Sequence, residues 1–345
     1  MLQKVVNRQT DTWTWAASST ISNDIRCSGA VTRLVFRVAL TPSATYVSNH
    51  AIDAFHRIIN SLNIVGAGGV HYLSMGDMQI GRMLHRLNQM DGLIKGTGHG
   101  VLSTPIDVVF VVHFGSRPQD QFGRDNPFDM SAFMPAFDDT ELRLDWLTTA
   151  NSVTDAIITI SSAIGYLTVY QVLGTASEIK AEMARQGVMQ TMIPVSSYRS
   201  YPHTGNLSDL SAEFDVPSGA FLRRIALLSQ DETGIPLYAL DQIASVGIKL
   251  PVGSQRVFQD DWRAFSLAQT PITSLNEADV AVTGGVINTM VGVGVVDLRT
   301  MANADYGLDL RGYKASDVKL GLTIENYTAG DDTFIWYDQV RPYSF

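Results

Sequence analysis

The chain has 345 residues, of which 45% are hydrophobic and 17% charged, and its formal net charge is −9 at pH 7. This length exceeds the size at which one hydrophobic core usually keeps growing, so we expect two domains. The negative charge argues against direct, sequence-specific binding of nucleic acid, because such binding depends on clustered Lys and Arg. The charged fraction is below the usual quarter or so, which indicates large surfaces buried in an assembly.

Cysteine usage and the first residues indicate where the protein is made. Cys27 is the single cysteine, which excludes an intrachain disulfide and a CxxC metal site. The N-terminus lacks the pattern of a signal peptide, and no apolar run approaches the roughly 18 residues that span a bilayer. We therefore expect synthesis in a reducing compartment, the cytosol.

Taken in chain order, the first segment is MLQKVVNRQ, which is locally positive through Lys4 and Arg8 and is expected to be a frayed terminus. The apolar segments that follow are short and bounded by turns, which is typical of strands. They are 33–40, 107–115 and 156–173 in the first half, and 223–229, 244–250, 288–298, 318–327 and 333–340 in the second. The sequence therefore predicts an all-β protein.

Helical patterns are few. Residues 76–90 carry Met and Leu at helical spacing, and 259–269 lies near the corresponding place in the second half. A third predicted helix runs from Thr175 to Gly187, where glycine ends it, and it marks a junction between the two halves.

A long segment without sustained periodicity, residues 115–139, is rich in Asp, Pro and Phe. Insertions of this length usually carry contacts. Exposing four phenylalanines together would be costly, so we expect them to be buried against a neighbour. They are Phe122, Phe128, Phe133 and Phe137.

Segments of the first half recur in the second half in the same order, and four pairs are visible. The first pair is GAVTRLV from Gly29 and GAFLRRI from Gly219, offset by 190 residues; the second is IINSLNIVG and QIASVGIKLPVG, which match Ile59 to Ile243 at an offset of 184. The third is LDWLTTANSVTDAIITI from Leu144 and LDLRGYKASDVKLGLTI from Leu308, offset by 164 and interpreted as the same strand. The fourth is TVYQV (168–172) and WYDQV (336–340).

A repeat of this length fits the tandem duplication of a whole domain, because solenoid units are only roughly 20 to 50 residues long. About eight short strands with long connections suit a jelly roll better than an immunoglobulin-like sandwich. We predict two tandem eight-stranded jelly rolls with a few short helices. The expected limits are 1–174 for the N-terminal roll, 175–205 for a connecting helix and linker, and 206–345 for the C-terminal roll.

Nothing in the sequence indicates catalysis. The serine-hydrolase elbow, the zincin motif and the phosphate loop are absent. The seven histidines are scattered without metal-site spacing, and adjacent acids such as Asp138 and Asp139 point to opposite faces of a strand. Asp145 and Asp309 match in the third pair, which suggests a role in the fold. We assign no catalytic, cofactor-binding or metal-binding residue, and we expect no cofactor.

The recurring GAVTRLVFRVAL and GAFLRRIALLS, IINSLNIVG and IASVGIKLPVG, and the pair beginning at Leu144 and Leu308 resemble the double jelly-roll major capsid proteins of tailless icosahedral viruses, many of which have an internal membrane. The resemblance implies a homotrimeric, pseudo-hexagonal capsomer that tiles an icosahedral shell in the virion. It also implies contacts with neighbouring capsomers and with penton and minor capsid proteins, and an N-terminus near the membrane, where Lys4 and Arg8 would lie. The family has no catalytic residues to transfer.

Two other classes of function remain open. One is a two-domain jelly-roll hydrolase with acids in an interdomain cleft, although that class is commonly secreted and stabilised by disulfides. The other is a carbohydrate-binding or attachment protein, which requires exposed aromatic residues on a concave face. The tryptophans are dispersed and are expected in the core instead; they are Trp13, Trp15, Trp146, Trp262 and Trp336.

Overall fold

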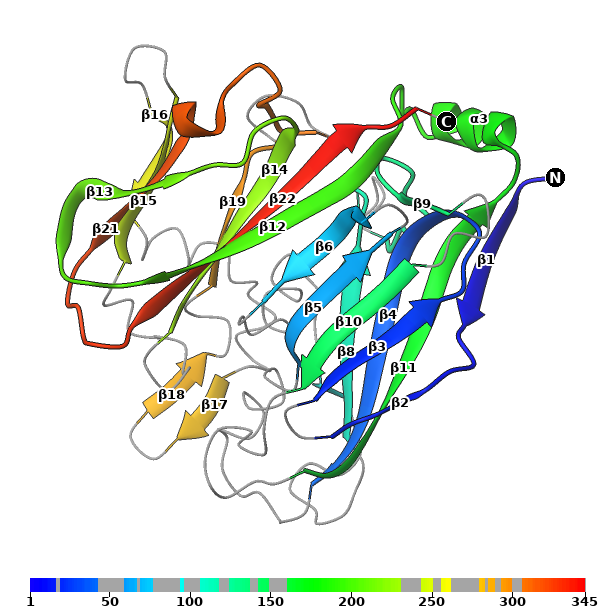
Figure 1. The fold of residues 1–345 in the computed structure, drawn as a ribbon, viewed down its shortest axis with the longest axis horizontal. Coiled ribbons are helices and arrows are strands. Elements are labelled where there is room, and N and C mark those ends of the chain that lie inside the picture. The colour runs from blue at the N-terminus through cyan, green and yellow to red at the C-terminus, as the bar shows by residue number, and fades with distance from the viewer. Residues whose placement is uncertain are drawn as a thin grey trace. The chain divides into compact units, whose positions relative to one another are not determined.

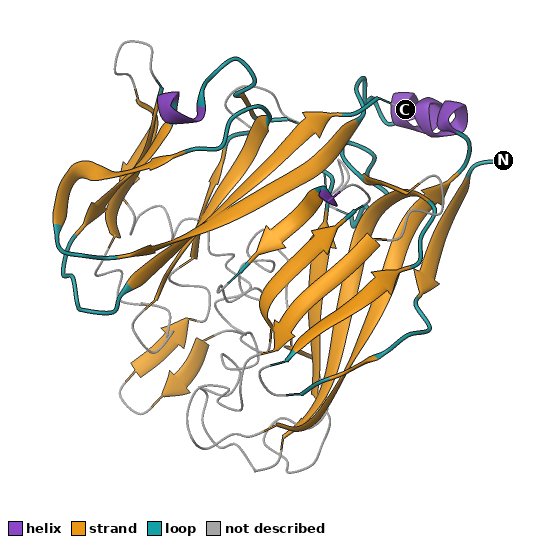
Figure 2. Ribbon diagram, viewed as in Figure 1, coloured by secondary structure: helices purple, strands orange, loops and turns teal. Residues whose placement is uncertain are grey.

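A computed structural model shows the chain as antiparallel sheets joined by loops, with little helix (Figure 2). It describes residues 1–16, 19–42, 59–66, 69–76, 94–95, 106–117, 124–136, 142–148, 160–230, 243–250, 256–261, 279–282, 285–288, 293–299 and 306–344. The chain divides into two compact units. The first is Met1–Ser197 with Val340–Phe345, and the second is Tyr198–Gln339.

The first unit contains two sheets. Sheet 1 has the strand order β1-β11-β4-β8-β7, with β2 added to β11 and β9 added to β4. Its strands are β1 (Gln3–Arg8), β2 (Trp13–Thr14), β4 (Gly29–Pro42), β7 (Ile94–Lys95), β8 (Ile106–His113), β9 (Met134–Ala136) and β11 (Ile160–Leu173). Sheet 2 has the order β3-β10-β5-β6 and consists of β3 (Thr20–Ile25), β10 (Leu142–Thr148), β5 (Ile59–Val65) and β6 (His71–Met75).

The remaining strands repeat this arrangement (Figure 1). Sheet 3 has the order β12-β22-β14-β19, with β20 added to β14, and its strands are β12 (Met192–Pro202), β22 (Asp332–Pro342), β14 (Phe221–Gln230), β19 (Val293–Asp297) and β20 (Leu308–Asp309). Sheet 4 has the order β13-β21-β15-β16 and consists of β13 (Leu207–Asp215), β21 (Lys319–Ile324), β15 (Ile243–Lys249) and β16 (Arg256–Asp261). A separate hairpin pairs β17 (Asp279–Val282) with β18 (Gly285–Asn288).

The strand order identifies each half as a jelly roll. When the eight principal strands are counted along the chain, both halves have one sheet in the order 1-8-3-6 and a second in the order 2-7-4-5. This is the eight-stranded, two-sheet architecture of the jelly roll. The predicted fold class is confirmed. The predicted limits 1–174, 175–205 and 206–345 stay a prediction about separable domains.

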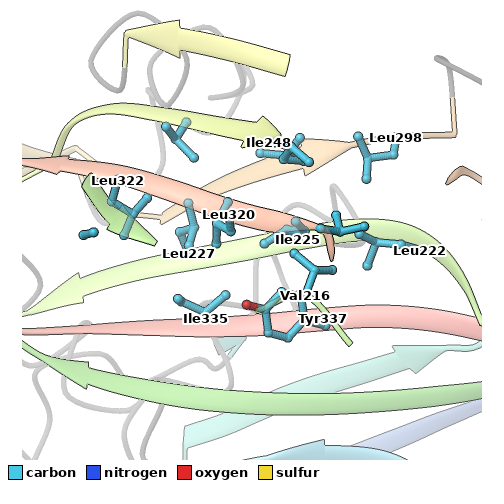
Figure 3. Packing of buried hydrophobic residues seen from close by; sticks show 14 of the residues in the cluster. Val216, Leu222, Ile225, Leu227, Ile248, Leu298, Leu320, Leu322, Ile335 and Tyr337 are labelled. Atoms are coloured by element: carbon cyan, nitrogen blue, oxygen red, sulfur yellow. The ribbon is translucent and has the colours of Figure 1, made fainter. Parts of the chain in front are cut away.

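Alternation of side chains places the cores between paired sheets. Along β4, Leu34, Phe36, Val38 and Leu40 are buried while the residues between them are more exposed, as a strand with one inward face requires. In the second unit the core combines residues from sheet 3, such as Leu222, Ile225, Ile335 and Tyr337, with residues from sheet 4. Figure 3 shows how these side chains meet, together with Ile248, Leu320 and Leu322.

Three of the four sequence pairs fall on equivalent strands, and the third pair does not. Leu308 lies in β20, which pairs with β14, whereas Leu144 lies in β10, which pairs with β5 at Ile64. In the second roll the residue opposite Ile248, the counterpart of Ile64, is Leu320. The true offset of this strand is therefore 320 − 144 = 176, and interpreting Leu144 and Leu308 as one strand was wrong.

The N-terminal segment is also not a frayed end. Residues Gln3–Arg8 form β1, the first strand of the first roll, and pair with β11 from Thr168 to Leu173. Its sequence shows no alternation because β1 is an exposed strand at the edge of sheet 1. Backbone hydrogen bonds rather than a buried side-chain face define it.

The predicted helix at Thr175–Gly187 is confirmed as α3 (Ala176–Arg185). Thr175 caps its first turn in a capping box with Glu178, and Gly187 follows with φ +73°, a conformation that glycine adopts without steric cost. Of the predicted helix 259–269, residues 259–261 are instead the end of β16, and the rest lies outside the described residues. Residues 77–90 also lie outside them. No described helix is long and apolar enough to cross a bilayer.

Candidate functional site

Of the seven histidines, His71 is exposed, His113 and His203 are buried, and the other four lie outside the described residues. His203 shares a hydrogen bond of 2.7 Å with the Thr333 hydroxyl. Within the described part of the chain, no three His, Cys, Asp or Glu side chains are grouped as a metal site would require.

One buried cluster contains the three residue types of a hydrolase triad. His113 Nε2 lies 3.6 Å from Asp129 Oδ2, and Ser131 donates both its backbone N–H and its hydroxyl to the Asp129 carboxylate, each at 2.9 Å. In a triad the histidine stands between the other two and takes the serine proton. Here the aspartate stands between them, so the serine has no base and the cluster organises the loop instead.

The loop that contains this cluster corresponds to the predicted insertion, residues 115–139. Asp129 also accepts a hydrogen bond of 2.6 Å from the Arg117 backbone N–H, and the Ser131 hydroxyl accepts one of 2.6 Å from Ser116. Phe133 is fully buried against α3, beside Ile179 and Met183. Phe128 is half-buried in the same cluster, and Phe122 and Phe137 lie outside the described residues. The sequence predicted that these phenylalanines are buried against a neighbour, and for Phe133 that neighbour is α3 of the same chain.

Helix α3, strand β1 and this loop are joined by a polar network. Glu182 bonds to Arg185 at 2.7 Å and to Lys4 of β1 at 3.0 Å. The hydrogen bonds from Arg185, together with those from Gln186 and Lys4, outweigh burial and lower the pKa of Glu182 to about 2. The Gln186 side chain accepts from Met130 N–H at 3.0 Å and donates to the Phe128 carbonyl at 3.1 Å. The network fixes β1, the first strand of the first roll, to α3, the helix that follows the last strand of that roll.

Each roll also holds a buried arginine on its third strand. Arg33 of β4 makes two hydrogen bonds to Asp125, at 2.8 and 2.7 Å, and its guanidinium lies 5.5 Å from the centre of the Tyr170 ring. In the second roll, Arg223 and Arg224 both bond to Asp338, at 2.6 and 2.7 Å.

The arginine clusters differ in the source of their carboxylate. Asp338 stands at the position of Tyr170 in the TVYQV and WYDQV pair. Burial raises the pKa of Asp338, but the charges of Arg223 and Arg224 and their hydrogen bonds outweigh it, so the pKa lies below its usual range. Buried ion pairs of this kind specify packing, and neither cluster includes a nucleophile.

The other candidate residues are also structural. Trp13 and Trp336 are buried, as expected for core tryptophans, Trp15 is half-buried, and the side chains of Trp146 and Trp262 lie outside the described set. Burial raises the pKa of the Cys27 thiol to about 12, so the reactive thiolate is scarce at neutral pH. Asp309 pairs with Arg311 on the surface.

The outer side of sheet 1 is the remaining candidate, as a surface for contact with other molecules. Outside the part covered by α3, this side presents six residues from the adjacent strands β1, β11 and β4. We call these residues the open face: Val6, Arg8, Val35, Arg37, Ile164 and Tyr166. Val6 is 52% exposed and Ile164 40%. Arg8 and Arg37 lie over the Tyr166 ring, at 4.5 and 5.2 Å from its centre.

Comparison with known proteins supports the fold. No protein-family model and no curated protein matches the sequence. The MCP of Sulfolobus turreted icosahedral virus (STIV) matches with a TM-score of 0.65 and 16% identity, over 98% of this chain and 96% of that one. The PBCV-1 virus capsid matches with a TM-score of 0.60 and 12% identity, over 99% and 94% of the two chains.

A third match is the major capsid protein of bacteriophage PM2, with a TM-score of 0.50 and 12% identity over 99% of this chain and 98% of that one. The chain therefore has the double jelly-roll fold of these viral major capsid proteins, over essentially their whole length. At identities this low, the likeness concerns the fold.

Proposed function

We propose that the chain is a viral major capsid protein that acts by assembly and not by catalysis. The observation that carries this proposal is the duplication: two rolls with the same strand order and a buried, carboxylate-bound arginine on the third strand of each. The full-length match to capsid proteins of the same fold supports it. The buried serine, histidine and aspartate cluster, which cannot activate its serine, favours a structural role over the hydrolase alternative.

Duplication gives the proposal a geometric reason. A cyclic trimer of a chain with two similar rolls places six similar rolls around one axis, so its outline is nearly hexagonal. Hexagonal units pack edge to edge and can tile the facets of an icosahedral shell. The partners of the chain are then two further copies, the neighbouring capsomers, and the penton and minor capsid proteins.

The N-terminus is proposed to face inward, near a minor capsid protein or an internal membrane. Its two basic residues are already engaged within the chain, Lys4 with Glu182 and Arg8 with Tyr166. A membrane contact would therefore be made by a folded edge strand. The chain acts in the virion shell after synthesis in the host cytoplasm.

Light scattering on the purified protein tests the proposal. A trimer of about 113 kDa, three times the chain mass of 37.7 kDa, or larger sheets and shells, supports a capsid role. Electron microscopy of the same material should show capsomers with a hexagonal outline. A protein that stays monomeric at 37.7 kDa across the accessible concentration range would contradict it.

A further inference from the structure

The open face has the composition of a contact surface. Arginine and tyrosine are enriched in the cores of protein interfaces, because they combine large contact areas with polar groups. Here Tyr166 lies between Arg8 and Arg37, with Ile164 two residues before it on β11 and Val6 on the adjacent strand β1. Arg37 is 47% exposed and its charge is met by Asp107, at 2.9 Å.

In the second roll, the face that corresponds to the open face is buried. The offset of 168 between β11 and β22 matches Tyr166 to Phe334 and Thr168 to Trp336. Phe334 is 3% exposed and Trp336 4%, whereas Tyr166 and Thr168 are half-exposed. The residues that point inward, Ile335 and Tyr337, belong to the core, so Phe334 and Trp336 must lie on the outer face of their sheet.

The third strand of each roll repeats the contrast. In each third strand a buried arginine directly precedes inward residues, Leu34 and Phe36 in β4 and Ile225 and Leu227 in β14, so we match Arg33 to Arg224. In β4, the outward residues two and four positions after Arg33 are Val35 and Arg37. In β14, the outward residues two and four positions after Arg224 are Ala226 and Leu228. Both residues of β14 are fully buried, while Val35 is half-exposed and Arg37 exposed.

We propose that the open face is covered by a second copy of the chain in the capsomer. The inference rests on the proposed function and adds the surface that the trimer uses. In a closed ring of similar modules the contacts are heterologous, and each module presents the same face to a neighbour. The counterpart residues of the second roll are buried, and the open face of the first roll becomes buried in the same way when the next chain covers it.

The chemistry of the two faces agrees with this assignment. The residues of the second roll at the positions of the open face, Ala226, Leu228, Phe334 and Trp336, are apolar and buried in the folded chain. The open face must be in contact with water in the unassembled chain and buried in the capsomer. A tyrosine with two arginines suits both environments. Arg8 adds a positive charge to this face, and a chain of net charge −9 supplies carboxylates to meet it.

Two substitutions test the face directly. Ile164→Asp places a carboxylate on the open face, and burying it in an interface costs several kcal/mol. Tyr166→Asp removes the aromatic ring between Arg8 and Arg37, and with it the largest contact area of the open face. We expect each variant to shift from a trimer of about three times 37.7 kDa to a monomer with an unchanged circular dichroism spectrum. Met189→Asp is the matched control, because Met189 is also an exposed apolar residue, 94% exposed, but it follows α3 in the chain and is not one of the open-face residues. It should remain a trimer.

Thiol labelling provides a second measurement that does not depend on disrupting the assembly. Cys27 contributes little background because of its raised pKa. In the trimer, Ile164→Cys should react with a maleimide about tenfold or more slowly than Met189→Cys. Labelling rates within about threefold of each other would show that the open face stays in solvent.

The outcomes separate the two proposals. A monomeric wild-type protein overturns both. A wild-type trimer that survives Tyr166→Asp and Ile164→Asp, or that leaves Ile164→Cys freely reactive, overturns only the assignment of the face. Loss of the trimer in both aspartate variants but not in Met189→Asp, together with slow labelling of Ile164→Cys, supports it.

Discussion

Gln171 and Gln339 occupy matching positions on the last strands of the two rolls, and each anchors the chain just before a matching glycine. The Gln171 side chain accepts a hydrogen bond of 3.1 Å from the Ser28 N–H, next to Gly29. The Gln339 side chain donates one of 2.8 Å to the Pro217 carbonyl, two residues before Gly219. In both modules the eighth strand is thus hydrogen-bonded to the segment that precedes the third strand, although donor and acceptor are exchanged.

The matched glycines should differ in their tolerance of alanine. Gly29 and Gly219 have φ of +94° and +85°, so alanine at either costs about 1–2 kcal/mol of stability through backbone strain. At Gly29 the new Cβ would also lie 2.5 Å from the Val172 carbonyl oxygen, whereas at Gly219 nothing lies within 4 Å. Urea unfolding should show a loss larger by about 1–3 kcal/mol for Gly29→Ala. Equal losses would show that Val172 moves freely.

Removing the carboxylate charge of Asp338 should destabilise the second roll. Asp338→Asn leaves Arg223 and Arg224 buried without a counter-charge, and we expect a loss of about 3–5 kcal/mol in the free energy of unfolding. Because the pKa of Asp338 is lowered in the folded chain, its contribution is present above about pH 4 and is lost as the pH falls through the folded value. Urea unfolding followed by tryptophan fluorescence measures the loss.

The control for this substitution is Asp309→Asn. Asp309 pairs with Arg311 as Asp338 pairs with Arg223. Both side chains of the Asp309 pair are nearly half exposed, however, at 49% for Asp309 and 45% for Arg311. Solvent screens such pairs, so the expected loss is below about 1 kcal/mol. A similar loss in the two variants would mean that burial does not set the strength of the Asp338 pairs.

The first roll can be given the ion pair of the second. Asp125→Ala should cost about 1–3 kcal/mol, because Arg33 then lacks its bidentate partner. Adding Tyr170→Asp places a carboxylate opposite Arg33, at the position that Asp338 holds in the second roll. The double variant should recover part of the loss in thermal unfolding. A double variant less stable than Asp125→Ala would argue that the two arginine sites are not interchangeable.

His203 should make stability depend on pH. Burial lowers its pKa below the usual 6.5, and Asp331 opposes this only in part. The unfolded chain therefore binds the proton more readily than the folded chain, so stability is complete above about pH 6.5 and declines as the pH falls toward the folded value. The slope reaches at most about 1.4 kcal/mol per pH unit. His203→Gln should flatten the profile between pH 7 and 5 in urea titrations, and an unchanged profile would contradict this role.

The sequence predicted the strands that carry strong local signals. Gly29 and Gly219 mark equivalent turns, and the strands that follow them share a period of two, so β4 and β14 were recognisable as one element. Helix α3 carries its own capping box and terminal glycine, which are also local. These features need no knowledge of distant parts of the chain.

Features that depend on distant pairing were missed. β10 and β20 both contain Leu followed by Asp, at 144–145 and 308–309, yet only the backbone pairing with β5 and β14 shows that they belong to different sheets. Any two strands with a buried face share a period of two, so short matches between them arise easily. β1 was missed because its edge position leaves no side-chain pattern.

The candidate site was predictable only in part. The low charged fraction and the resemblance to double jelly-roll capsid proteins pointed to assembly, but the open face combines residues from β1, β4 and β11 that are up to 160 positions apart, as Val6 and Tyr166 are. Arg33 and Asp125 are separated by 92 residues, so their pairing required the fold. Duplication was the one signal in the sequence that related the two faces.

The division of the chain has a consequence for how it is made. The first unit ends at Ser197 but includes Val340–Phe345, where Tyr343 donates a hydrogen bond of 2.9 Å to the Thr191 carbonyl. A ribosome must add the 142 residues from Tyr198 to Gln339 before that segment emerges, which takes about 7–28 s at roughly 5–20 residues per second. The first unit therefore lacks its final segment until the second unit has been synthesised. The unit that is synthesised first is the last to have all its residues.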